Sequence, residues 1–231
     1  MTFPFPFVRT KRPRGIPAFS ATPVDTRTIA ASQSVYTFAG VNFGDRHDYG
    51  QVLVCYGHRA SSGLNDLVLG SSSIAGKVPT LICANAWEVI GVGAMIVDYW
   101  GASGDITLTF PKAQASGCSI LVYRLVNFRP GPSVGVASGI SSSNGSDTTL
   151  NPTDIAVANG ALAIGVAARA NSSFSPTWNN GLTQASNILV GAGNMRMSVA
   201  FQLVTPAATK NYTVGTGSGA ANAMAIGSIN P

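Results

Sequence analysis

Short apolar runs separated at regular intervals by turn-forming residues constrain the fold of this chain more than any other feature. From about residue 33 onward, turn signals such as Ser-Ser-Gly, Gly-Ala-Ser-Gly and Ser-Ser-Asn-Gly-Ser recur roughly every 8 to 14 residues. Ile106, Leu108 and Phe110 alternate with threonines, which places apolar and polar side chains on opposite faces of a strand. We find no helical stripe of any length, so the pattern predicts an all-β chain.

The predicted strands follow the apolar runs. They cover residues 35–43, 51–58, 67–69, 77–83, 93–100, 105–110, 118–126, 161–168, 174–178, 187–190, 195–204, 212–216 and 223–229. Residues 84–89 are the one candidate for a short helical turn. Many short strands with this spacing predict a two-sheet antiparallel sandwich of jelly-roll type.

A repeated pattern of strands suggests that the sandwich is built from two similar halves. Each half ends with an apolar strand, a Thr-rich strand and a second apolar strand, separated by Gly-rich turns. We therefore divide the sandwich, residues 33–231, into halves at about 33–128 and 147–231. A Gly- and Ser-rich connection, residues 129–151, joins them.

Residues 1–32 differ from the rest of the chain and predict an extended N-terminal arm. The first 25 residues hold five of the 13 prolines, which fix φ and remove backbone donors, so we expect neither a helix nor a central strand. Phe3, Phe5 and Phe7 alternate with proline and form an apolar strip suited to docking in a groove of another chain. The alternative is an unattached terminus.

The charges divide the chain into a basic segment and a nearly neutral body. Of 14 Lys and Arg residues, Arg9, Lys11, Arg12 and Arg14 form a basic run in the arm, and without these four the chain holds 10 basic against 9 acidic residues. Charged residues make up 10% of the chain against about 25% in ordinary domains, which excludes a disordered chain and a coiled coil. We expect the basic run to contact an acidic protein surface or to be solvated. Nucleic acid is the less favoured partner, because no aromatic side chains interleave with the cations.

The cysteines and the hydropathy pattern give further expectations. Cys55, Cys83 and Cys118 are widely spaced in strand-like contexts, which favours buried free thiols, with a Cys55–Cys118 disulfide as the alternative. No apolar run reaches the roughly 18 to 20 residues that a membrane helix needs, and the N-terminus lacks the order of a signal peptide. We expect no zinc, no cofactor and no membrane association.

Few residues suggest a chemical site, and the common catalytic motifs are absent from the sequence, so we do not expect an enzyme. Asp45, His47 and Asp48 could bind a divalent cation or act in acid–base chemistry, but a charged loop between strands explains them more simply. His58, at a strand end, is interpreted as a solvated residue. Trp178, in a polar loop-like setting, is the one aromatic residue that suits contact with a glycan.

Several stretches of the chain are similar in residue pattern to strands of a known group of proteins. They are MRMSVAFQLVT (195–205), KNYTVG (210–215), AMAIGSI (223–229) and the region from VLVCY (52–56) through CSILVY (118–123). Over roughly residues 34–231 the chain resembles the β-sandwich modules of tailed-bacteriophage virion proteins, including capsid decoration and tail accessory proteins. The resemblance includes no diagnostic motif and does not extend to the arm.

This resemblance implies a non-enzymatic virion structural protein, located in the virion after assembly in the host cytoplasm. Its partners would be the major capsid or tail proteins of the same particle. A symmetric homo-oligomer, such as a trimer, is the expected state, with the arm docked on a neighbouring subunit. The alternative function is a carbohydrate- or receptor-binding sandwich used in adhesion.

Overall fold

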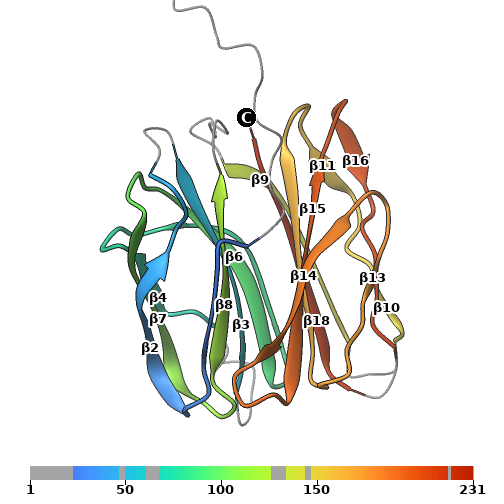
Figure 1. Cartoon of the computed structure of the whole chain (residues 1–231). Coiled ribbons are helices and arrows are strands. Elements are labelled where there is room, and N and C mark those ends of the chain that lie inside the picture. The colour runs from blue at the N-terminus through green and yellow to red at the C-terminus, as the bar shows by residue number, and fades with distance from the viewer. Residues whose placement is uncertain are drawn as a thin grey trace, which may run out of the picture.

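Short apolar runs, some of them alternating with polar residues, form β-strands along the described part of the chain. The computed structural model describes residues 23–46, 50–60, 68–125, 134–143, 147–217 and 220–230. Within these ranges every regular element is a strand, and all strand pairs are antiparallel (Figure 1). The predicted all-β, antiparallel sandwich architecture is therefore confirmed at this level.

The first part of the chain forms two sheets. The N-terminal inner sheet has the order β1-β8-β3-β6-β5, with β1 at Asp25–Ile29, β8 at Cys118–Leu125, β3 at Gln51–Arg59, β6 at Ile90–Asp98 and β5 at Thr80–Trp87. The N-terminal outer sheet has the order β2-β7-β4, with β2 at Gln33–Asn42, β7 at Ser103–Gln114 and β4 at Ser71–Ile74.

The second part forms two more sheets and a two-stranded ribbon. The C-terminal inner sheet has the order β14-β15-β12-β18-β9, with β14 at Thr183–Val190, β15 at Met195–Leu203, β12 at Leu162–Arg169, β18 at Asn222–Ile229 and β9 at Val134–Ser143. The C-terminal outer sheet has the order β10-β17-β13, at Thr149–Leu150, Val214–Gly215 and Thr177–Trp178. The ribbon pairs β11 (Ile155–Val157) with β16 (Ala208–Lys210).

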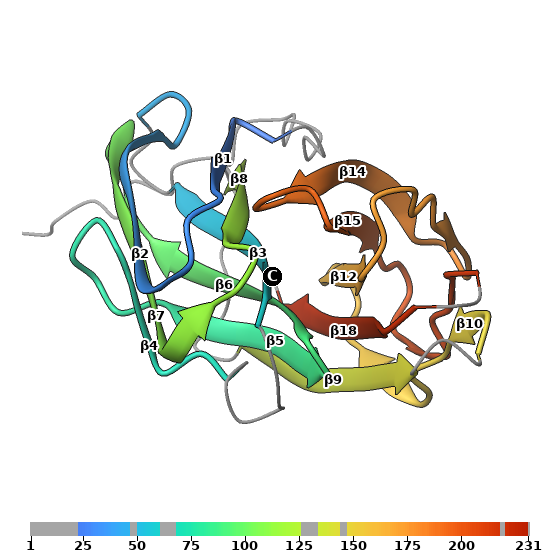
Figure 2. The ribbon, with the colours of Figure 1, turned by 90° about the horizontal axis from the view of Figure 1, so that it is seen from below.

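The sheets stack in layers with three apolar cores between them. The central core lies between the two inner sheets, where Leu53 and Leu121 meet Ile164 and Val166. A second core fills the space between the N-terminal inner and outer sheets, and a third lies between the C-terminal inner sheet and the outer sheet with its ribbon. Figure 2 shows the inner sheets facing each other, with β5 lying against β9 and β18 along one side.

The strand orders of the two parts correspond one to one. In the inner sheets, the order β1-β8-β3-β6-β5 corresponds to β9-β18-β12-β15-β14. In the outer sheets, β2-β7-β4 corresponds to β10-β17-β13. The corresponding edge strands even share an irregularity, a β-bulge between Leu81 and Cys83 in β5 and between Gln184 and Ser186 in β14. The ribbon β11-β16 has no counterpart. The half boundaries at 33–128 and 147–231 stay a prediction.

Four details differ from the sequence expectations. The sandwich has four main sheets and a ribbon rather than two sheets, because both faces of each inner sheet are apolar and need a cover. Residues 84–89 form the end of β5 and a turn, with Glu88 at φ 51°, instead of a helical turn. Residues 25–29, assigned to the arm, form edge strand β1. The expected connection 129–151 contains strands β9 and β10.

Candidate functional sites

The arm residues proposed for docking lie outside the described residues. This holds for Phe3, Phe5, Phe7, Arg9, Lys11, Arg12 and Arg14. His47 and Asp48 of the proposed cation site also lie outside, and the described Asp45 is exposed. Among the described residues no three His, Cys, Asp or Glu side chains gather as metal ligands do. The arm and the cation site both stay predictions.

Arg124 organises the loops at the end of the N-terminal half where β6 and β8 end. Its guanidinium donates to the carbonyl of Phe43 at 2.7 Å and to the carbonyls of Tyr99 and Gly101. Burial of the side chain lowers the pKa of Arg124, and the charges of Tyr99 and Asp45 act in the opposite direction. Because one buried cation satisfies three backbone acceptors, its role is to hold loops together.

Other cations of the body also donate to backbone carbonyls. Arg59 donates to Asn194 at 3.0 Å, Arg196 to Ser172 at 2.6 Å and Lys77 to Asp98 at 3.0 Å. These bonds connect strand ends to neighbouring turns. These three cations therefore stabilise loops of the body and do not form a charged binding face.

Trp178, the residue proposed for glycan contact, is half-buried in β13. Its indole N–H donates to the Ser198 hydroxyl at 2.9 Å, and its ring lies over Gly165, where an added Cβ would approach Trp178 Cζ3 to 2.6 Å. The ring packs against the core between the C-terminal inner and outer sheets. The indole N–H of Trp178 therefore already has a hydrogen-bond partner within the protein, and part of the ring packs against the core. A contact with glycan stays a prediction.

His58 is buried, so the interpretation as a solvated strand end is wrong. It is 1% exposed, and its ring lies 4.1 Å from the Phe110 ring, measured between centroids. Its Nδ1 lies 2.9 Å from the side-chain oxygen of Gln114, which is itself fully buried. A signal was present in the sequence: His58 shares strand parity with Val52, Val54 and Tyr56, all of which face the same core.

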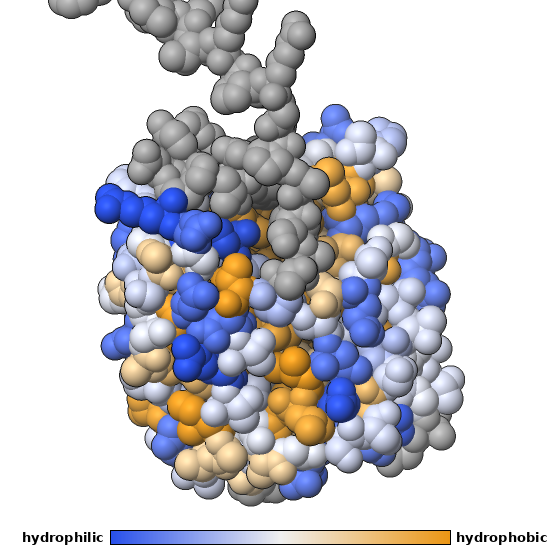
Figure 3. All heavy atoms as spheres, in the orientation of Figure 1, coloured by the Kyte–Doolittle hydropathy of each residue, from blue (hydrophilic) through white to orange (hydrophobic). Residues whose placement is uncertain are grey.

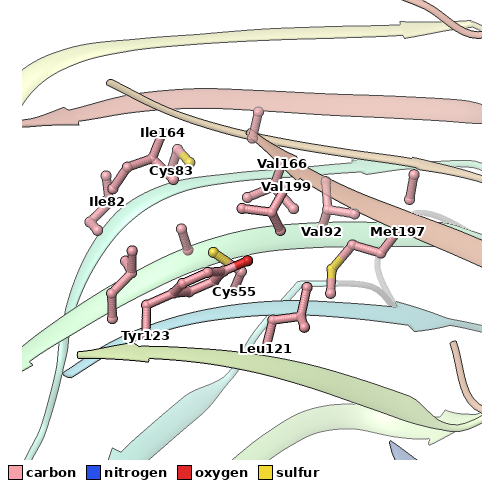
Figure 4. Close-up of a cluster of buried hydrophobic side chains, with 14 of the residues drawn as sticks. Cys55, Ile82, Cys83, Val92, Leu121, Tyr123, Ile164, Val166, Met197 and Val199 are labelled. Atoms are coloured by element: carbon pink, nitrogen blue, oxygen red, sulfur yellow. The ribbon is translucent and has the colours of Figure 1, made fainter. Parts of the chain in front are cut away.

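The three cysteines are free and buried, as the sequence predicted. Cys55 and Cys83 lie in the central core near Tyr123 (Figure 4), whereas Cys118 faces the core between the N-terminal sheets. Cys55 and Cys118 therefore point to opposite faces of the same sheet, which excludes a disulfide between them. Burial raises the pKa of Cys83 to about 12 and raises the pKa of the other two thiols as well.

Three of the four edge strands of the inner sheets lack the charges and prolines that keep strands from pairing with other chains, although β5 and β14 carry a β-bulge. Strands β5, β9 and β14 contain neither a charged residue nor a proline, and each pairs with one other strand. Large apolar side chains are also exposed, at Val35, Val68, Val78, Leu81, Trp100, Ile140, Leu189 and Leu203. Figure 3 shows apolar atoms reaching the surface over the lower part of one face, which includes the β14 edge.

Two shallow hollows lie on the surface of the described residues. One, of about 590 Å³, is lined by Asn180, Gly181 and residues 208–211, and another, of about 480 Å³, by residues 156–158 and 207–209. Both border the ribbon β11-β16. Asn180 donates to the Asn211 carbonyl, and the Asn211 side chain accepts from the Asp154 amide at 2.8 Å, so these polar groups already have partners. None of the described segments forms a helix suited to crossing a membrane.

Comparisons with known proteins give little further information. No protein-family model matches the chain, and no curated protein matches it. Among solved structures, the chain is similar to one in the crystal structure of Cucumber Necrosis Virus, with 12% identity and a TM-score of 0.28. The alignment covers 92% of this chain and 85% of that chain. A TM-score this low carries no argument, so function must be inferred from the residues themselves.

Proposed function

We propose that this protein is a non-enzymatic structural component of a virus particle, of the kind that attaches to or projects from a phage capsid or tail. The observation that carries the proposal is the set of edge strands β5, β9 and β14, which lack charges and prolines. Soluble monomers commonly protect such edges with Lys, proline or short strands. Strands β5 and β9 lie against each other within the chain, so β14 is the edge that a neighbouring subunit could cover.

The pairing of strands supports a jelly-roll assignment for each half. In the first half β1 pairs with β8, β2 with β7 and β3 with β6, which is the nested order of a long hairpin rolled into two sheets. In the second half β9 pairs with β18, β10 with β17 and β12 with β15. Jelly rolls of eight strands occur in viral capsid proteins and in lectins. The fold alone does not choose between them.

Two features favour the structural role over glycan binding. The two hollows beside the ribbon β11-β16 are shallow, and the side chains of Asn180 and Asn211 at one of them already have hydrogen-bond partners. The Trp178 N–H donates to Ser198 rather than pointing outward. We therefore propose a homo-oligomer that binds capsid or tail proteins of the same virion. Phe3, Phe5, Phe7 and the basic run of the arm dock on the neighbouring subunit.

Arm variants of the full chain test this proposal. We expect deletion of residues 2–16 to abolish attachment to particles while the far-ultraviolet circular dichroism of the sandwich is unchanged. Replacing the three phenylalanines by serine tests the apolar contact, and replacing the four cations by serine tests the charged one. Particle occupancy is measured by sedimentation and gel densitometry.

The oligomeric state gives a second, independent test. We expect analytical ultracentrifugation of the purified chain to show a closed oligomer at micromolar concentration. A monomer at high concentration, together with unchanged particle occupancy of the deletion variant, would overturn the structural role. Binding to a glycan array that is lost in W178A would instead favour the lectin alternative.

A further inference from the structure

The buried His58–Gln114 pair joins the two sheets of the N-terminal half. His58 belongs to β3 of the inner sheet, and Gln114 ends β7 of the outer sheet. The Gln114 amide nitrogen donates to the Lys112 carbonyl at 2.9 Å, which orients the amide oxygen towards the imidazole. Because that oxygen can only accept, His58 Nδ1 carries the proton and donates to it.

Among the described residues no carboxylate acts on the charge of His58, since the causes of its pKa shift are burial and the bond to Gln114. The titratable neighbours are Tyr56 from β3, Cys118 from β8 and Tyr36 from β2, whose hydroxyl donates to the Gln114 carbonyl. All three are neutral between pH 4 and 7, since burial raises their pKa values. On the β6 side, a Cβ added at Gly91 would lie 2.3 Å from His58 Nε2, so this nitrogen faces the backbone closely.

The pair also lies at the base of the β7–β8 turn, which contacts the C-terminal half. Residues 115–117 follow Gln114, and Ser116 donates its amide to the Arg59 carbonyl at 3.2 Å. The Ser116 carbonyl accepts from the amide of Ala192, in the turn between β14 and β15, at 2.7 Å. The position of the β7–β8 turn therefore links His58 to the contact between the N-terminal and C-terminal halves.

We propose that the His58–Gln114 pair is an acid-sensitive latch that holds the β7–β8 turn against the C-terminal half at neutral pH and releases it in acid. Protonation at Nε2 places a positive charge among Phe110, Tyr56 and Cys118 with no counter-charge. The charge is better solvated when β7 and the turn move away and admit water. This inference is independent of the proposed virion role.

The expected pH range follows from the direction of the pKa shift. Burial lowers the pKa of His58 from 6.5 to about 4, although the bond to Gln114 acts in the opposite direction. Between these two values the open form binds a proton that the closed form does not, so the closed form loses stability as pH falls from 6.5 to 4. At pH 4.5 the closed form is disfavoured by roughly 60-fold relative to pH 7.

Hydrogen exchange of the full chain tests the latch. We expect the protection factor of the Ala192 amide, corrected for intrinsic exchange, to fall by roughly 10- to 100-fold between pH 7 and 4.5. The amide of Ile164 in the middle of β12 should be much less affected. The variant H58Q should lose this pH dependence, and H47Q, which changes the other histidine of the chain, should retain it.

If H58Q does not fold, the pKa of the His58 ring can still be measured in the unmodified chain by NMR titration of the histidine rings. In the unmodified chain we expect the His58 ring to titrate well below 6.5. Titration of His58 near 6.5 in the folded protein would overturn the proposal. Equal loss of protection at Ala192 and Ile164, or an unchanged pH dependence in H58Q, would overturn it as well.

Discussion

At the scale of single residues, polar side chains in this protein act mainly on its own backbone. Arg124 holds three loop carbonyls, and Trp178 donates to Ser198. At corresponding positions of the two halves, different side chains form hydrogen bonds between an inner sheet and the segment next to it. Where His58 of β3 bonds to Gln114, Arg169 of β12 donates to the Thr216 carbonyl at 2.6 Å. Both bonds tie an inner sheet to the segment that returns from the outer sheet.

The two tryptophans Trp178 and Trp100 give a matched pair for testing packing against surface exposure. W178A removes a half-buried ring over Gly165 and leaves the Ser198 hydroxyl without its donor. We expect a loss of about 2–3 kcal/mol in the free energy of unfolding, measured by urea denaturation. W100A, at a side chain that is 57% exposed, should change stability by less than about 0.5 kcal/mol. Equal effects would contradict the packing role of Trp178.

The three thiols give a test of the cores. Burial raises the pKa of Cys83 to about 12 and raises those of Cys55 and Cys118, so the reactive thiolate is scarce at pH 8. We expect a thiol reagent such as DTNB to label none of the three cysteines in the native protein within minutes and all three in urea. Rapid labelling of one thiol in the native state would show that its core is open to solvent.

At the scale of elements, the turn between β14 and β15 depends on a glycine for close contact. Gly191 has φ +54°, and a Cβ there would lie 1.5 Å from the Ser116 carbonyl oxygen. Gly193, in the same turn, has φ +87° but no atom within 4 Å of its Cβ position. The two positions therefore separate backbone strain from steric clash.

We expect G193A to cost about 1 kcal/mol through its backbone conformation alone. G191A should cost at least about 3 kcal/mol more, because the β14–β15 turn must move away from the β7–β8 turn. Thermal and urea denaturation measure both. Similar costs for the two variants would show that the contact between the turns does not stabilise the fold.

The strands that could be predicted most closely from the sequence are continuous apolar runs bounded by turn-forming residues. The predictions at 51–58, 118–126, 195–204 and 223–229 match β3, β8, β15 and β18 to within a residue or two. Strand β9 was missed because VGVASGISSS is rich in Gly and Ser and looks like a loop. Its pairing with β18 overrides that local preference. The number of layers could not be predicted, because a strand buried on both faces shows no alternation.

The candidate sites were harder to predict than the strands. The parity of His58 with Val52, Val54 and Tyr56 can be read from the sequence, but its burial at a strand end also depends on the neighbouring strands β6 and β8. The closeness of Trp178 to Gly165 depends on the pairing of the two-residue strand β13 with β17, which no local pattern encodes. Long-range pairing therefore decided which polar and aromatic residues are buried.

At the scale of the whole molecule, the central core makes each half depend on the other. Leu53, Cys55 and Leu121 come from the first half, and Ile164, Val166 and Val199 come from the second. Either half alone would expose the inner face of a five-stranded sheet. Such a face is a large apolar surface that favours aggregation.

Separate expression of the halves tests this dependence. We expect residues 23–128 alone and residues 134–231 alone to aggregate or to bind ANS strongly, because the central core is missing from each. Co-expression should restore a soluble complex that contains both pieces in equal amounts and has the circular dichroism of the intact chain. The co-expressed pair is the control for loss of the connecting segment. If each half instead unfolds cooperatively as a monodisperse monomer, the inner sheets are stable without each other and the central core is an interface between two independent domains.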